Sequence, residues 1–307
     1  MTHKNKFQII SHLYGITVDK ASYIELGNFI LCDYNYLYLN YQNSKDTFSR
    51  KFNHGIKENK IALIDNYFII MKNIKANDEK EARQKFYNNV EDFINVVLYS
   101  IPMLTPENQQ ITITQINASD EIFIIKESSS SEFYATKDLL NPIYKVNENL
   151  FNIKGNSRKL FEFIDDNNLS EIETKIKRSV SWVGQSLRKT DIVESFLNLC
   201  VAFETLFCYQ REFISDSLIS QMTEQAAYIC EKNLEARKTI IKNIKDLYSI
   251  RSSIVHRGSA DIKDDDFFLL LSIIKKIIQG LLKLIETQNI KTAEQLRNFL
   301  IDKKFSV

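Results

Sequence analysis

Short runs of alternating apolar and polar residues indicate that the first half of the chain is rich in β-strands. These runs cover residues 7–18, 22–33, 62–75, 110–116 and 121–126. Alternation with a period of two residues is typical of strands that bury one face. The tyrosine-rich stretch from Tyr34 to Tyr41 favours half-buried strand packing, with a stacking platform for single-stranded RNA as the alternative.

One long helix is predicted among these strands, from Glu79 to Ser100. Its apolar side chains recur at helical spacing, at Ala82, Phe86, Val90, Phe93 and Val97. Asp78 is placed to cap the first turn, and Pro102 prevents the helix from continuing. Residues 1–156 are therefore expected to form an α+β domain.

The second half of the chain changes to a helical period after the breaker Gly155-Asn156. Helices are expected at about 158–167, 170–188, 191–212, 215–232, 234–257, 264–287 and 292–303. Ser170, Asp191 and Asp264 are the expected N-caps. We therefore predict an α+β domain over residues 1–156, followed by an all-α bundle over residues 157–307.

Composition and charge exclude several classes of protein. Lysine and arginine number 40 against 39 aspartate and glutamate residues, so any anion-binding site must be local. The most apolar stretch, residues 267–285, is interrupted by lysines, and no leader pattern opens the chain. We expect a cytoplasmic protein with no membrane span, whose four cysteines are reduced thiols.

The glycines form neither a dinucleotide-binding nor a P-loop pattern, and no metal-ligand spacing was recognised. We therefore expect no cofactor and no metal. Residues 1–156 contain no recognised catalytic motif, which suggests a role in sensing, substrate positioning or partner binding.

Arg251 interrupts an apolar stripe on the predicted helix 234–257. Ile244 and Leu247 precede it and Ile254 follows it on this stripe. A guanidinium removed from water needs an anion or several acceptors close by. Either a carboxylate or a phosphate should therefore face Arg251.

His256 follows in the last turn of the same helix, about 140° around the helix axis from Arg251. Gly258 is the expected stop signal, and the helix dipole favours a cation at this end. The spacing by itself is a weak signal, since Arg50 and His54 nearly repeat it.

The surrounding sequence makes the pattern more specific. The strings LYSIRSSIVHRG at residues 247–258 and WVGQSLRKTDIVESFLNLCVAFETLF at residues 182–207 resemble the Apea-like HEPN family of prokaryotic defence proteins. Trp182 and Glu204 match the family's aromatic-led helix and its glutamate in an apolar setting. Arg251, His256 and Gly258 match its Arg-x4-His-x-Gly ending. Many HEPN nucleases carry Asn, Asp or His directly after the arginine, where this chain has Ser252.

The resemblance implies a HEPN-like helical bundle that dimerises, so that two motifs face one cleft. It implies a metal-independent endoribonuclease in which Arg251 and His256 are catalytic. Arg257, adjacent to His256, is a candidate for binding a flanking phosphate, and Ser252 is a second candidate substrate-binding residue. The implied partners are RNA, including tRNA, a second copy of the chain, and an antitoxin or phage-derived trigger of a defence system.

Simpler interpretations stand beside these. Glu204 is favoured as a structural partner of Arg251 or another arginine rather than as a chemical group. Arg257 is explained equally well by the helix dipole. The acidic run at Asp261, Asp264, Asp265 and Asp266 is better explained by helix N-terminal charge than by metal binding. The whole bundle is alternatively a non-catalytic dimerisation or nucleotide- and RNA-binding module.

Overall fold

The computed structural model describes residues 5–14, 16–18, 23–41, 67–101, 117–126, 144–146, 157–207, 216–258 and 261–305. The chain forms two compact units. The first comprises residues 1–101 and 107–165, and the second comprises 102–106 and 166–307. An α+β unit followed by a helical one confirms the predicted order of fold classes.

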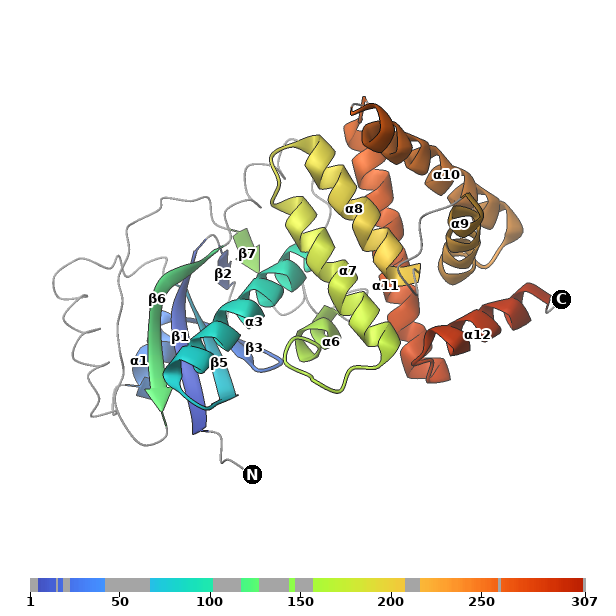
Figure 1. Ribbon diagram of the computed structural model, residues 1–307. Coiled ribbons are helices and arrows are strands. Elements are labelled where there is room, and N and C mark those ends of the chain that lie inside the picture. Colours follow the sequence, from blue (N-terminus) through green and yellow to red (C-terminus); the bar gives the residue numbers. More distant parts are fainter. Residues whose placement is uncertain are drawn as a thin grey trace. The chain divides into compact units, whose positions relative to one another are not determined.

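A five-stranded antiparallel sheet forms the core of the first unit (Figure 1). Its strand order is β3-β4-β5-β1-β6. The strands are β1 (Asn5–Tyr14), β3 (Tyr23–Leu26), β4 (Phe29–Asp33), β5 (Tyr67–Ala76) and β6 (Asn117–Lys126). A separate parallel pair joins β2 (Ile16–Val18) to β7 (Tyr144–Val146). The predicted strand at 110–116 lies outside the described residues.

The predicted strand at 22–33 is two strands joined by a tight hairpin. Gly27 and Asn28 form the turn between β3 and β4, and Gly27 has a φ of 57° that only glycine adopts readily. A Cβ on Gly27 would also meet the Phe161 carbonyl oxygen at 2.7 Å. The alternating pattern correctly predicted β-structure over this stretch. The Gly-Asn pair is a recognised hairpin signal, and the prediction was wrong only in overlooking this turn.

Helix α3 (Glu79–Ser100) packs against β1, β5 and β6. The Asp78 carboxylate accepts the Glu81 N–H at 2.7 Å, which confirms the predicted cap. Phe93 lies at the centre of the packing, with ring centroids 4.9 Å from Phe29 and 5.1 Å from Phe161 of α6 (Ser157–Glu162). The long apolar stripe of α3 is thereby buried as its spacing predicted.

The tyrosine-rich stretch was wrongly expected to be a strand. Residues Tyr34–Tyr41 form helix α1. The Asp33 carboxylate accepts the Tyr36 N–H at 2.8 Å and so starts a helical turn directly after β4. Leu37 is fully buried, and this local cap and its packing override the β-propensity of the tyrosines.

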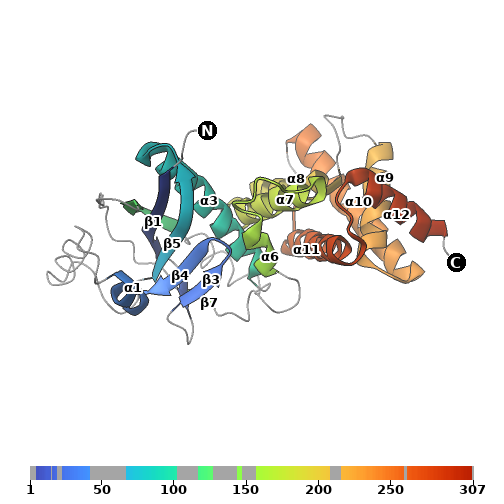
Figure 2. The same cartoon turned by 90° about the horizontal axis from the view of Figure 1, so that it is seen from below.

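The second unit is built from helices alone within its described residues. These are α7 (Glu171–Leu187), α8 (Ile192–Phe207), α9 (Asp216–Cys230), α10 (Leu234–Arg257), α11 (Asp264–Gln288) and α12 (Ala293–Phe305). The apolar helix α11 contacts α7, α8, α9 and α10, and Figures 1 and 2 show it running between them. Its N-cap is Lys263, so Asp264 is the first helical residue rather than the expected cap.

Helices α7 and α8 form a tightly packed antiparallel pair. Ser170 caps the start of α7, as predicted, and also forms a capping box with Glu173. The Asp191 carboxylate accepts the Glu194 N–H at 2.9 Å at the start of α8, which confirms the second predicted cap. Two buried serines then exchange hydrogen bonds. The Ser186 hydroxyl donates to the Ser195 carbonyl at 2.7 Å, and the Ser195 hydroxyl donates to the Ser186 carbonyl at 3.0 Å.

Two further expectations concern membranes and thiols. Among the described helices, none combines the length and apolarity needed to cross a bilayer. Cys32, Cys200 and Cys230 are free thiols, and Cys208 lies outside the described residues.

Replacing Ser186 with alanine is expected to lower the free energy of unfolding by about 1–3 kcal/mol, because the Ser186 hydroxyl is fully buried and its loss breaks the exchange with Ser195. Urea unfolding of the full chain measures this change. The exposed Ser220→Ala is the matched control and should cost little. Equal losses from both variants would contradict a special role for this pair.

Candidate functional site

Helix α10 positions the Arg251 to His256 motif. The Asn233 side chain accepts the Ala236 N–H at 2.8 Å, so a cap fixes the start of the helix. Ile244 and Leu247, which precede Arg251 on the same stripe of the helix, are buried. The bounds of α10 are those that the periodicity predicted.

Arg251 meets Glu204 of α8. The Arg251 Nε lies 3.5 Å from the Glu204 Oε1, and the two side chains are 26% and 14% exposed. The cation that Glu204 required is therefore Arg251, and the anion that Arg251 required is a carboxylate of its own chain. Arg251 retains further N–H donors on a side chain that water or a ligand can still reach.

Tyr248 completes this group, and sequence analysis missed it. Its hydroxyl donates to the Glu204 Oε1 at 3.2 Å, while its ring packs edge-on against Phe203 with centroids 5.7 Å apart. Tyr248 precedes Arg251 by three positions and so lies on the same face of α10. A tyrosine at that spacing, beside an arginine that needs an anion, was the available signal.

Burial dominates the electrostatics around Glu204. Desolvation raises the pKa of the Glu204 carboxyl above its usual range, although Arg251 and the Tyr248 hydroxyl act in the opposite direction. One turn earlier on α8, burial together with the Glu204 charge raises the pKa of the Cys200 thiol. Cys200 is therefore a packing residue and not a thiolate nucleophile.

The other residues of the motif face solvent. Ser252, His256 and Arg257 are exposed, and Val255 beside them is 52% exposed. Ser252 and His256 are four positions apart and share one face of α10. Arg251 points instead toward α8, so the helical geometry does not direct Arg251 and His256 of one chain at the same point.

Gly258 ends α10 immediately after the motif. Its φ is 74°, in the left-handed region, and its N–H donates to the Ile254 carbonyl at 2.9 Å. A Cβ placed on Gly258 would meet nothing within 4 Å. The requirement for glycine is therefore conformational and not steric.

The acidic run after the motif serves the start of α11. Asp264, Asp265 and Asp266 occupy its first turn, and the Asp266 carboxylate accepts the Lys263 N–H at 3.1 Å. Negative charge there complements the helix dipole. Within the part of the chain that the structure describes, no three His, Cys, Asp or Glu side chains gather as metal ligands would.

Comparison with known proteins does not extend this picture. No protein-family model, curated protein or solved structure matches the chain. The HEPN resemblance stays a prediction, and the residues of α8 and α10 are the basis for the function proposed below.

Gly258→Ala is expected to lower the free energy of unfolding by about 1–2 kcal/mol, because alanine pays a steric penalty in the left-handed conformation. Gly258→Asn should cost less, since asparagine tolerates this region better. Thermal or urea unfolding of the two variants tests the order. An alanine variant as stable as wild type would show that the end of α10 rearranges without cost.

The stability contributed by Glu204 should depend on pH. Its folded pKa is raised, so its contribution is fully present below the unfolded pKa of a glutamate and is lost as pH rises through the folded value. As pH falls from neutral through the folded pKa of Glu204 toward its unfolded pKa, the free energy of unfolding of wild type should therefore rise relative to that of Glu204→Gln. Urea unfolding across this range measures the difference, with the exposed Glu235→Gln as control. If the difference in unfolding free energy between wild type and Glu204→Gln did not change with pH, the raised pKa of the buried Glu204 carboxyl would be contradicted.

Proposed function

We propose that the chain is a metal-independent endoribonuclease of the HEPN type, acting in the cytoplasm as a dimer. The observation that carries the proposal is the half-buried guanidinium of Arg251, which Glu204 holds five residues before the exposed His256. An arginine fixed in this way is preorganised to stabilise negative charge that develops on a phosphate.

Arg251 binds the scissile phosphate in this proposal. The contact with Glu204 uses the Nε edge, and the remaining N–H donors are available for phosphate oxygens. Glu204 and Tyr248 act as positioning residues, because they orient the guanidinium without touching the RNA. Ser252 and Arg257, both exposed on the last turns of α10, bind neighbouring parts of the RNA backbone.

His256 moves protons in the cleavage step. The RNA 2′-oxygen attacks the adjacent phosphorus while a base removes its proton, and the bond from phosphorus to the 5′-oxygen breaks as an acid donates a proton to that oxygen. The products carry a 2′,3′-cyclic phosphate and a 5′-hydroxyl. The exposed position of His256 allows an RNA strand to approach it.

A second copy of the chain supplies the groups that one copy lacks. The step needs a base, an acid and positive charge, whereas one motif offers a single histidine. Two-fold pairing through the exposed end of α10 would bring a second His256 and Arg251 to the same cleft. Val255, an apolar side chain 52% exposed beside His256, is suited to burial in such an interface.

The biological role follows from the resemblance alone. A ribonuclease of this kind is proposed to act as a toxin or anti-phage effector on cellular RNA, with tRNA as one candidate substrate. An antitoxin or a phage-derived trigger would control it, and residues 1–156 are proposed to sense that signal or to position the RNA.

One observation favours a non-catalytic alternative. Glu204 already satisfies Arg251, so the motif can be explained as a structural ion pair in a dimerisation or nucleotide- and RNA-binding module. In that case His256 would only complement the C-terminal end of α10.

Cleavage of total RNA and of tRNA in EDTA separates these functions. Wild-type protein is expected to produce fragments with cyclic-phosphate ends. His256→Ala is expected to lower the rate by at least about 100-fold, the usual contribution of a general acid or base, and Arg251→Ala by a similar factor, the usual contribution of a group that stabilises transition-state charge. The exposed Lys242→Ala on the same helix is the matched control and should cleave normally. Circular dichroism of each variant establishes that the fold is retained.

Intact RNA with wild type, or equal cleavage by wild type and His256→Ala, would overturn the nuclease proposal. RNA bound but not cut would favour the binding module.

A further inference from the structure

Three cations gather at the connection between α9 and α10. Arg237 lies in the first turn of α10, Lys232 lies between the two helices, and Lys303 lies near the end of α12. The Lys303 ammonium donates to the Tyr228 carbonyl at 2.7 Å, which attaches α12 to the last turn of α9. Figure 1 shows the end of α12 beside this connection, at the opposite end of α10 from the candidate site.

The Arg237 guanidinium is held in one position. Its Nε donates to the Glu231 carbonyl at 3.0 Å, and its Nη2 donates to the Lys232 carbonyl at 2.9 Å. The guanidinium also lies over the Tyr228 ring, 4.1 Å from the ring centroid. The third nitrogen, Nη1, makes neither of these hydrogen bonds and has N–H groups that a ligand can accept.

The carboxylates near these cations in sequence are paired with other lysines. The ion pairs are Glu231–Lys276 at 3.0 Å, Glu224–Lys304 at 2.6 Å and Glu235–Lys238 at 2.8 Å. Asp302 precedes Lys303 on α12, and its side chain leaves the helix about 100° away from that of Lys303. Among the described residues, no ion pair joins a carboxylate to Arg237, Lys232 or Lys303.

The end of α9 accounts for only part of this positive charge. A helix C-terminus carries about half a negative charge, so three cations leave an excess of about two and a half positive charges. Burial, and then the charges of Arg237 and Lys232, lower the pKa of the Lys303 ammonium, so the cations are close enough to repel one another. The net charge of the whole chain is only +1, so this excess is a local feature.

An exposed leucine borders the three cations. Leu234 is the first residue of α10 and is 62% exposed. It precedes Arg237 by three positions, so the two side chains share one side of the helix. Protein interfaces combine apolar contacts of this kind with polar contacts around them. A nucleic-acid backbone offers charge but no aliphatic side chain to cover Leu234, whereas a polypeptide offers both.

We propose that this surface binds an acidic segment of a protein partner, with carboxylates on Arg237, Lys232 and Lys303 and an apolar side chain against Leu234. A guanidinium held in place is suited to a carboxylate, because its N–H groups match the spacing of the two oxygens. Arg237 and His256 are about 28 Å apart along α10, so a partner can bind here without covering His256. The surface uses no residue of the candidate site and stands independently of the proposed ribonuclease activity.

Fluorescence anisotropy of labelled peptides tests this proposal with the full chain. A short peptide of glutamate and leucine, the acidic leucine peptide, is expected to bind saturably at low ionic strength and more weakly as salt is added, because salt screens exposed charges. A peptide with glutamine in place of glutamate, and a peptide of glutamate alone, each lack one recognised group and are expected to bind about tenfold more weakly. The measurement needs no RNA, so a chain that fails to cut RNA still tests the proposal.

Lys232→Gln and Arg237→Gln are each expected to weaken binding of the acidic leucine peptide about tenfold, the loss of one charge-assisted contact. Lys242→Gln is the matched control, because Lys242 is exposed on α10 and lies about 140° around the helix axis from Arg237. Lys232 is exposed, and Arg237 uses its backbone carbonyl rather than its side chain. Lys232→Gln should therefore keep the fold intact even if Arg237→Gln does not.

Two kinds of result would overturn the proposal. The first is no saturable binding of the acidic leucine peptide, or equal affinities of Lys232→Gln and Lys242→Gln for it. The second is tighter binding of a single-stranded deoxyoligonucleotide, or of phosphatidylglycerol vesicles, than of the peptide, with that binding lost in Lys232→Gln. This second result would assign the surface to a nucleic acid or to a membrane instead of a protein partner.

Discussion

The removal of the Glu204 carboxylate from water is the constraint around which the candidate site is built. Glu204 lies on the apolar helix α8, and burial alone would make its charge costly. Arg251 and Tyr248, both on α10, reduce that cost from one side. The same contacts help to fix the face that α10 turns toward α8. His256 lies about 140° around the helix axis from Arg251 and is exposed.

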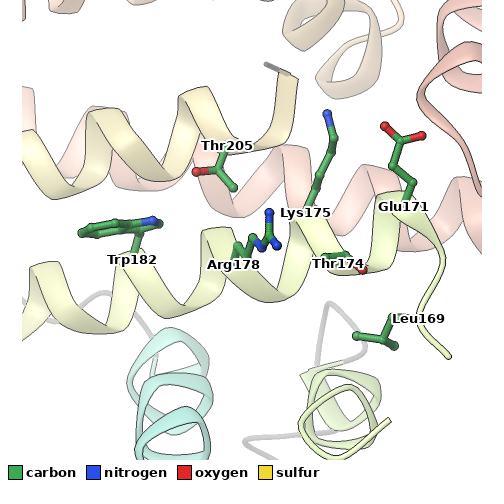
Figure 3. Close-up of a pocket in the computed structure, with 7 residues that line it drawn as sticks. All are labelled: Leu169, Glu171, Thr174, Lys175, Arg178, Trp182 and Thr205. Carbon is green, nitrogen blue, oxygen red and sulfur yellow. The ribbon is translucent and has the colours of Figure 1, made fainter. Parts of the chain in front are cut away.

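Helix α8 also contributes Thr205 to a cavity of about 550 Å³ that is lined mainly by α7 (Figure 3). Successive residues on a helix point about 100° apart, so Glu204 and Thr205 face different neighbours from adjacent positions. The exchange of hydrogen bonds between Ser186 and Ser195 fixes α8 against α7 close to the turn between them. One packed pair of helices therefore positions both Glu204 and Thr205.

Much of the helical unit could be predicted from sequence, because periodicity and caps are local properties. The bounds of α10 and the cap at Ser170 depend on residues within one or two turns, and both were predicted. The secondary-structure predictions were wrong where one residue overrode the average preference of its neighbours. Asp33 caps a helix of tyrosines that favour strands, and Gly27 divides one predicted strand into a hairpin.

The sequence by itself determined that Arg251 needs an anion, that Glu204 needs a cation and that Gly258 ends the helix, because each follows from the chemistry of one residue in its local pattern. Only the tertiary structure decided that Arg251 and Glu204 meet each other, that Tyr248 joins them, and that Lys175 lines a cavity with Trp182. These pairings depend on how separate helices pack, and the packing of side chains distant in sequence is not encoded in the period of any one helix.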